Sequence, residues 1–132
     1  PDDVYISKLK PSDGQCINDV WPHRYPGSQK VIEDLIQHNG GYGVYSREGT
    51  GQLLSWGLNW FYGGLGIVQT AEGAQRRGYA SAIVAQVSRY MAQEFGYHVH
   101  ANIVWDNKPS LALFEKLGFR HVCTSYWISP PY

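Results

Sequence analysis

Apolar and polar positions alternate at the start of the chain and then change to a helical rhythm. Residues 4–9 alternate as a half-buried strand does. A helix is predicted to begin around Pro11, and two prolines and a glycine make 22–28 a loop. Apolar residues recur at helical spacing over 28–39, with Ser28 as the predicted cap. The opening third therefore predicts one strand followed by two helices.

Three short strands are predicted next. They cover residues 42–46, 52–61 and 65–70, and glycine-rich turns separate them. The last two are close enough in sequence to form a hairpin through 62–66. This region therefore predicts the antiparallel centre of a sheet.

The second half alternates helices with strands. A long amphipathic helix is predicted from about Tyr79 to Phe95, and a shorter one over 106–118. Each is followed by an alternating stretch, at 98–105 and 119–128, that predicts a strand. The predicted order β-α-α-β-β-β-α-β-α-β indicates an α/β fold, with helices flanking a mixed, mainly antiparallel sheet.

Composition limits the partners but does not identify one. The chain has 132 residues, with 11 Lys and Arg against 11 Asp and Glu, so its charge indicates neither nucleic acid nor a membrane surface. No apolar run approaches the roughly 18 residues of a membrane helix. The two cysteines, Cys16 and Cys123, suggest no disulfide framework, so an intracellular, reducing compartment (cytoplasm or mitochondrion) is expected. The length fits one domain, 1–132. Because the chain begins at Pro1 rather than Met, we expect it to be trimmed or cut from something longer.

The stretch QRRGYA, residues 75–80, carries the strongest chemical signal. It lies where a strand gives way to the long helix, and the first turn of a helix offers unpaired N–H groups and a positive dipole end. Arg76 and Arg77 add charge, and Gly78 lets an anion approach the backbone. The pattern predicts a phosphate or pyrophosphate site. The alternative is an ordinary surface turn with two solvated arginines.

The chain resembles the GNAT N-acetyltransferase superfamily through two motifs. Gln75, Gly78 and Ala80 match the fixed positions of its acyl-CoA pyrophosphate loop. Residues 107–119, NKPSLALFEKLGF, match its closing motif. Within the superfamily, LLSWGL and GIVQTAEGAQRRGYA look like the glycine N-acyltransferase-like branch.

This resemblance implies an acyl-CoA site, with acetyl-CoA as the default donor. Strand 67–70 would pair with the pantetheine and polarise the thioester, and the 75–81 segment would surround the pyrophosphate. Asn107 and Ser110 would reach the far side of CoA, although Asn107 could serve only as a helix cap. Phe114 could belong first to the core. The implied contacts are Ile67, Val68, Gln69, Thr70, Gln75, Arg76, Arg77, Gly78, Tyr79, Ala80, Ser81, Asn107, Ser110 and Phe114.

Two positions depart from the catalytic pattern of the superfamily. Many relatives protonate the leaving thiolate with a tyrosine where this chain has Phe114. Others place a glutamate base where this chain has Gly64. The resemblance therefore leaves both the general base and the general acid unassigned.

Five side chains could replace the missing groups. His98 and His100 alternate on one strand face beside the expected cleft, although both could simply lie on a wet sheet face. Glu72 precedes the anion loop and could serve as a base, although its position in a loop favours a solvated carboxylate. Tyr126 could protonate the thiolate, and Tyr62 is a further option. The His-x-His pair lacks additional ligands at recognisable spacing, so no metal is expected.

Together these features predict an enzyme that transfers an acyl group directly from acyl-CoA to an amine of a small molecule or amino acid such as glycine. A CoA-binding module without turnover, serving as a sensor or as the structural half of a larger enzyme, is the main alternative. A third possibility is a site for another phosphate ligand. The aromatic residues Trp56, Trp60, Phe61 and Tyr62 either line an acceptor pocket or pack against a neighbouring domain.

Overall fold

The computed structural model describes residues 2–128, 130 and 131 of the chain. It separates into two compact units, Pro1–Ala101 and Asn102–Tyr132, and each is described by itself.

A four-stranded antiparallel sheet forms the centre of the first unit. Its strands are β1 (Val4–Lys8), β2 (Gly41–Ser46), β3 (Leu53–Asn59) and β4 (Leu65–Thr70), arranged in that order. The predicted hairpin between β3 and β4 is confirmed, with Trp60 N–H donating to the Gly64 carbonyl at 2.8 Å. Consecutive strands are therefore neighbours throughout the described sheet, and β4 ends it.

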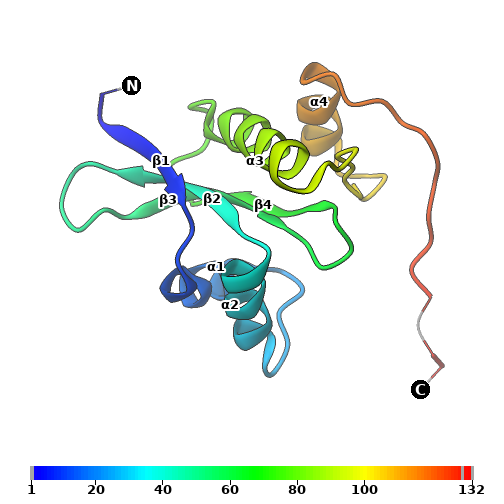
Figure 1. The fold of residues 1–132 in the computed structure, drawn as a ribbon, viewed down its shortest axis with the longest axis horizontal. Helices are drawn as coiled ribbons and strands as arrows, with labels where there is room; N and C mark the ends of the chain where they lie inside the picture. The colour runs from blue at the N-terminus through cyan, green and yellow to red at the C-terminus, as the bar shows by residue number, and fades with distance from the viewer. Residues whose placement is uncertain (1, 129, 132) are drawn as a thin grey trace. The chain divides into compact units, whose positions relative to one another are not determined.

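Helices cover both faces of this sheet (Figure 1). The short helix η1 (Pro11–Asp13), α1 (Gly14–Val20) and α2 (Ser28–His38) lie on one face, and α3 (Tyr79–Phe95) lies on the other. The ends of α2 and α3 agree closely with the predicted helices. The arrangement leaves the loop between β4 and α3 at one end of the sheet.

Each face of the sheet has its own apolar contacts. The core on the α1 and α2 side contains Leu9, Ile17, Ile32, Leu35, Ile36, Tyr45, Leu53, Trp56 and Leu58. On the other side α3 buries the predicted stripe Ile83, Val84, Val87 and Met91. A Cβ on Gly57 of β3 would lie 2.8 Å from Ile83 Cγ2, so glycine there allows α3 to approach the sheet.

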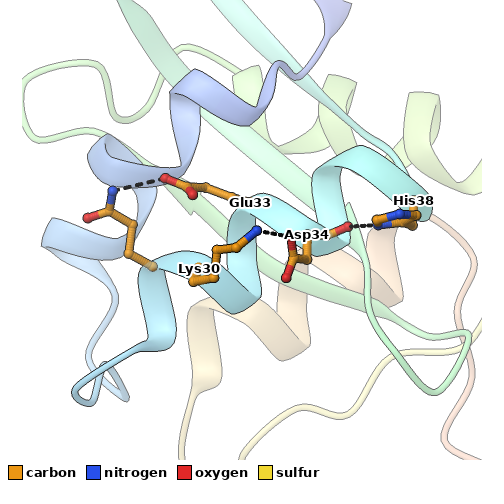
Figure 2. A network of polar contacts seen from close by, with 5 residues as sticks. Lys30, Glu33, Asp34 and His38 are labelled. Atoms are coloured by element: carbon orange, nitrogen blue, oxygen red, sulfur yellow. Dashed lines mark hydrogen bonds and ion pairs between the residues drawn. The ribbon is translucent and has the colours of Figure 1, made fainter.

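Helix α2 carries a polar outer face and packs closely on α1. Figure 2 shows Lys30 paired with Asp34, and His38 Nδ1 lies 2.8 Å from the Asp34 carbonyl oxygen. A Cβ on Gly14 would lie 2.5 Å from Glu33 Cγ, which explains the small residue at the start of α1. The exposed contacts on the outer face of α2 add little stability because solvent screens them, so α2 is held mainly by its apolar face.

The predicted cap of α2 was wrong by one residue. Gly27 is the N-cap, with φ of 92°, and Ser28 is the first helical residue. The Ser28 hydroxyl is fully buried, accepts from Tyr25 N–H and donates to Asn18 Oδ1 at 2.6 Å. Its hydrogen bonds therefore tie the preceding loop to α1.

In the second unit the short predicted helix is confirmed as α4 (Lys108–Lys116). Asn107 caps it by accepting from Ser110 N–H at 3.3 Å, and Gly118, with φ of 92°, follows its end. The rings of Phe114 and Phe119 pack edge to face at 5.0 Å.

The α/β class is confirmed, but the last two predicted strands were wrong. Neither 98–105 nor 119–128 forms a strand, and the described sheet is antiparallel rather than mixed. A strand needs a neighbour that exchanges backbone hydrogen bonds, and alternation alone does not supply one. Within the first unit, residues 98–101 make one such bond, from Leu65 N–H to the His100 carbonyl at 2.8 Å. Val122 and Ile128 are 86% and 93% exposed, so the expected buried face of 119–128 is absent.

Within the part of the chain that the structure describes, no helix combines the length and apolar character needed to cross a membrane.

Candidate active site

Strand β4 contains a bulge that interrupts its pairing with β3. Trp56 pairs with Gln69, and Leu58 pairs with Gly66, so Gly57 alone faces two residues, Ile67 and Val68. Ile67 has φ of 46°, a left-handed conformation that is costly for a β-branched residue. Such strain persists only where surrounding contacts enforce it, and it is concentrated at functional sites.

Beyond the bulge, alternate backbone groups of β4 point away from the sheet. Ala71 N–H donates to the Leu54 carbonyl at 2.8 Å, so the backbone of residue 71 faces β3. Alternation then turns the backbone groups of Val68 and Thr70 toward the outer edge. Since β4 is the last strand of the described sheet, these groups are free to pair with a ligand.

A buried serine holds this part of β4 in place. Ser55 is fully buried on β3, and its hydroxyl donates to the Gln69 carbonyl at 3.0 Å. It also lies 2.9 Å from the Thr70 hydroxyl. The outward backbone groups are therefore presented by a braced strand rather than by a loose edge.

The loop after β4 turns sharply before α3 begins. Ala74 is buried and donates to the Ala71 carbonyl at 3.0 Å, which fixes the start of the loop. Gly73, Arg76 and Gly78 all have positive φ, at 82°, 63° and 79°. Successive backbone amides in loops of this kind form concave anion-binding sites.

The amides at the end of this loop have no backbone partners. Among the described residues, no N–H group from 78 to 81 donates to a backbone acceptor, and the next amide, that of Ala82, donates to the Gly78 carbonyl. Gly78 is the N-cap of α3, and the buried Tyr79 anchors the first turn. We call the segment 75–81 the anion loop.

Charge around the anion loop is positive. Arg76 and Arg77 are exposed, and among residues 2–128, 130 and 131 the structure gives an ion pair only to Lys30 and Asp34. Both guanidinium groups are therefore free to bind an anion beside the positive end of α3. Gln75 is also exposed. The anion loop combines backbone donors, a helix terminus and two cations, as a pyrophosphate requires.

A shallow depression of about 410 Å³ lies at the tip of the β3–β4 hairpin. Its lining consists of Phe61, Tyr62, Gly63, Tyr97, His98 and His100. The Tyr62 and His100 rings stack with centroids 5.8 Å apart. We call this the histidine depression, and it brings together both predicted histidines.

The remaining predicted catalytic and binding residues lie elsewhere. Glu72 is exposed in the loop that follows β4. Tyr126 belongs to the second unit and is 84% exposed. Asn107 and Ser110 form the cap of α4, and Phe114 is buried in the same unit. The proposed contacts of these second-unit residues with CoA stay predictions.

An aromatic row beside the histidine depression was predicted only in part. Trp21, at the end of α1, contacts Trp60 with centroids 5.7 Å apart. The Trp60 and Phe61 rings are 5.3 Å apart, and those of Phe61 and Tyr62 are 5.2 Å apart. The row reaches His100 through Tyr62. The sequence grouped Trp60, Phe61 and Tyr62 with Trp56, but Trp56 is buried in the core instead. The sequence does not indicate that Trp21 joins residues of the distant hairpin.

The β4 bulge was also missed, although a signal existed. Gly64 and Gly66 flank the start of β4, and glycine within a strand often marks a bulge or a close approach.

Across the described residues, no three His, Cys, Asp or Glu side chains gather as metal ligands would.

The described residues combine a bulged edge strand with an anion loop at the start of a helix, and this combination points to one class of fold. The chain has the fold of the GNAT N-acetyltransferases. The sequence model of the FR47-like protein family matches residues 41–128, about two thirds of the chain. The chain therefore belongs to the FR47-like family. No curated protein matches it significantly in sequence.

Solved structures agree with this assignment of the fold. A Drosophila protein of known crystal structure is 30% identical, with a TM-score of 0.85 over 91% of this chain. The chain spans only 40% of that protein's length. The aminoglycoside N-acetyltransferase AAC(6')-Iy, solved with CoA, is 14% identical with a TM-score of 0.76, over 96% of this chain and 94% of its own. Arabidopsis thaliana NAA60, solved with acetyl-CoA, is 16% identical with a TM-score of 0.75, over 91% and 88%.

Proposed function

We propose that the chain is an acyl-CoA-dependent N-acyltransferase that transfers its acyl group directly to the amine of a small molecule or amino acid, glycine included. Acetyl-CoA is the default donor. Residues 1–132 supply one acyltransferase domain in this proposal, and the two free cysteines suit a reducing compartment.

The observation that carries the proposal is the direct connection between the open edge of β4 and the anion loop. The pyrophosphate of CoA would bind Arg76, Arg77 and the first amides of α3. The pantetheine carries amides, and these would pair with the outward groups of Val68 and Thr70. CoA has both a pyrophosphate and an amide-bearing arm, in the order in which the anion loop and β4 would bind them.

The same strand would assist the chemistry. A neutral amine attacks the thioester carbon, and a tetrahedral oxyanion develops before the carbon–sulfur bond breaks. Backbone N–H groups fixed at the bulge would stabilise that oxyanion without having to reorganise. The bracing of β4 by Ser55 keeps them in place.

We propose that side chains of this chain carry out the proton transfers of the reaction. The groups available are His98, His100, Glu72 and Tyr126, and the first two lie together in the histidine depression. Phe114 cannot protonate the thiolate, and no side chain extends from Gly64. On the far side of CoA, Asn107 and Ser110 are proposed to contact the arm of the donor.

The acceptor is proposed to enter beside the aromatic row. Phe61 is 65% exposed there, and aromatic faces attract ammonium groups. The aminoglycoside N-acetyltransferases of this fold, by their names, act on small amine compounds. A small amine or amino acid is therefore the proposed acceptor class.

Thermal unfolding with CoA, acetyl-CoA or ADP tests the donor site. CoA at about 100 times its dissociation constant should stabilise the chain by roughly 2.7 kcal/mol, and ADP should do less because it lacks pantetheine. Arg77→Glu should remove the shift, whereas Arg89→Glu, farther along α3, should keep it. Equal shifts with ADP and CoA would favour a general phosphate site. No shift with either would contradict the proposal.

A further inference from the structure

The residue just before the strand that is proposed to hold the thioester is a glycine covered by two rings. A Cβ built on Gly64 would lie 2.5 Å from Tyr62 Cε2 and 3.0 Å from His100 Nε2. Gly64 is buried, and its lack of a side chain lets both rings lie against the backbone. The Tyr62 and His100 rings therefore fill the space that a side chain at residue 64 would need, with Tyr62 Cε2 the nearer atom and His100 Nε2 beside it.

His100 is fixed from two directions. Its carbonyl accepts from Leu65 N–H at 2.8 Å, which attaches its backbone to the first residue of β4. Its ring stacks on Tyr62, with an angle of 28° between the planes. His98 and Tyr97 are the other titratable groups that line the depression. His100 remains exposed to the depression, so an incoming amine can reach it.

We propose that His100 is the catalytic base that takes the proton from the acceptor's ammonium group, and that Tyr62 and Gly64 position its ring. The inference rests on the proposed function. An amine bound as its ammonium form cannot attack a thioester until a base removes one proton. A neutral imidazole can accept that proton at Nε2.

The proton balance of the step is complete. Nε2 of His100 takes one proton from the ammonium, and the amine nitrogen then forms a bond to the thioester carbon. As the tetrahedral adduct collapses, the carbon–sulfur bond breaks and CoA leaves as a thiolate. The nitrogen loses a second proton, which neutralises the thiolate. The products are the amide, CoA and one proton, which passes from the imidazolium to solvent.

Chemical rescue gives the test, with acetyl-CoA and the best acceptor from an amine panel. His100→Ala should lower kcat by about 100-fold or more and should keep the thermal shift with CoA. Added imidazole should restore part of the rate, because it can occupy the space beside Tyr62. His38→Ala on α2 is the matched control and should keep the wild-type rate.

Two further variants test the positioning. Tyr62→Phe keeps the stacked ring and should retain most of the rate, whereas Tyr62→Ala should reduce both the rate and the imidazole rescue. Gly64→Ala should displace both rings, so it should lower kcat while CoA affinity is kept.

The outcomes separate this inference from the proposed function. An active wild type with an equally active His100→Ala variant would overturn the role of His100 alone. If His98→Ala lost activity and imidazole restored it, while His100→Ala kept the wild-type rate, His98 would be the base instead of His100. A wild type that binds no CoA and acylates no amine would instead overturn the proposed function.

Discussion

The anion loop and the histidine depression are built from different materials. The anion loop is formed mainly by backbone: left-handed residues, a helix terminus and amides without backbone partners. The histidine depression is formed by side chains, and its main feature is a ring pair that lies over a glycine. Backbone sites follow from short local motifs, whereas side-chain sites depend on packing between distant residues. The proposed donor site therefore depends mainly on local backbone geometry, whereas the proposed acceptor site depends on packing between residues that are distant in sequence.

Charge reversal in the anion loop should have the largest effect and should affect only one region. Replacing both Arg76→Glu and Arg77→Glu puts two negative charges beside the pyrophosphate. CoA affinity measured by calorimetry should fall by about 100-fold, or roughly 2.7 kcal/mol. Affinity for pantetheine, which has no phosphate, should change little. An equal loss for both ligands would show that the anion loop does not hold the phosphates.

The contact between α3 and the sheet should be the next most sensitive feature. Gly57→Ala places a methyl group 2.8 Å from Ile83 Cγ2, so unfolding in urea should show a loss of about 1–3 kcal/mol. Combining it with Ile83→Ala relieves the overlap, so the double variant should lose less than the sum of the two. Strict additivity would mean that the two residues do not press on each other.

A glutamate in the first turn of α3 should separate helix stability from ligand binding. Ser81→Glu complements the helix dipole and should raise stability by about 0.3–1 kcal/mol. The same carboxylate repels phosphate, so CoA affinity should fall by about tenfold. Gln93→Glu, near the other end of α3, is the control. It should lower stability and leave CoA affinity unchanged. Unchanged CoA binding in Ser81→Glu would place the phosphates elsewhere.

The smallest effect is expected away from both regions. Tyr45 is buried on β2, and its hydroxyl donates to Asp13 Oδ2 at 2.7 Å. Tyr45→Phe should cost about 1 kcal/mol of stability and should leave CoA binding and acyl transfer unchanged. A change in CoA binding or in acyl transfer would show that the Tyr45 hydrogen bond affects the proposed site as well as stability.

Tyr45 also gives a prediction for alkaline pH. Burial, followed by the hydrogen bond to Asp13, raises the pKa of the Tyr45 phenol. The folded state therefore favours the neutral phenol. Its contribution is complete below the unfolded pKa of about 10 and is lost as pH rises from there toward the folded pKa. Unfolding free energies from pH 9 to 11 should fall more steeply for wild type than for Tyr45→Phe.

The contrast between the two regions also explains what could be predicted from sequence. Helix α3 and strand β4 were predicted with their observed ends, because periodicity and glycine signals are local. The anion loop was predicted from Arg76, Arg77 and Gly78 at the start of a helix, and from the match of Gln75, Gly78 and Ala80 to the GNAT loop, and its role in binding an anion stays a prediction. The strands predicted at 98–105 and 119–128 were wrong, because alternation does not report whether a pairing partner exists.

The site residues show the same limit. The sequence offered His98 and His100 as equivalent members of one face. Only packing distinguishes them, because the Tyr62 ring and the space above Gly64 both involve His100. The glycines around the start of β4 are a local signal for a bulge, but its position at Ile67 required the register between β3 and β4.

Acyl transfer itself is the most direct test of the central claim. The wild-type chain would be mixed with acetyl-CoA and a panel of small amines and amino acids, including glycine. Free thiol and amide product would be measured together. The account predicts that both form in equal amounts, only when an amine is present, and not in the Arg76→Glu and Arg77→Glu double variant. Firm CoA binding without amide formation from any amine would contradict it and would identify a CoA-binding module.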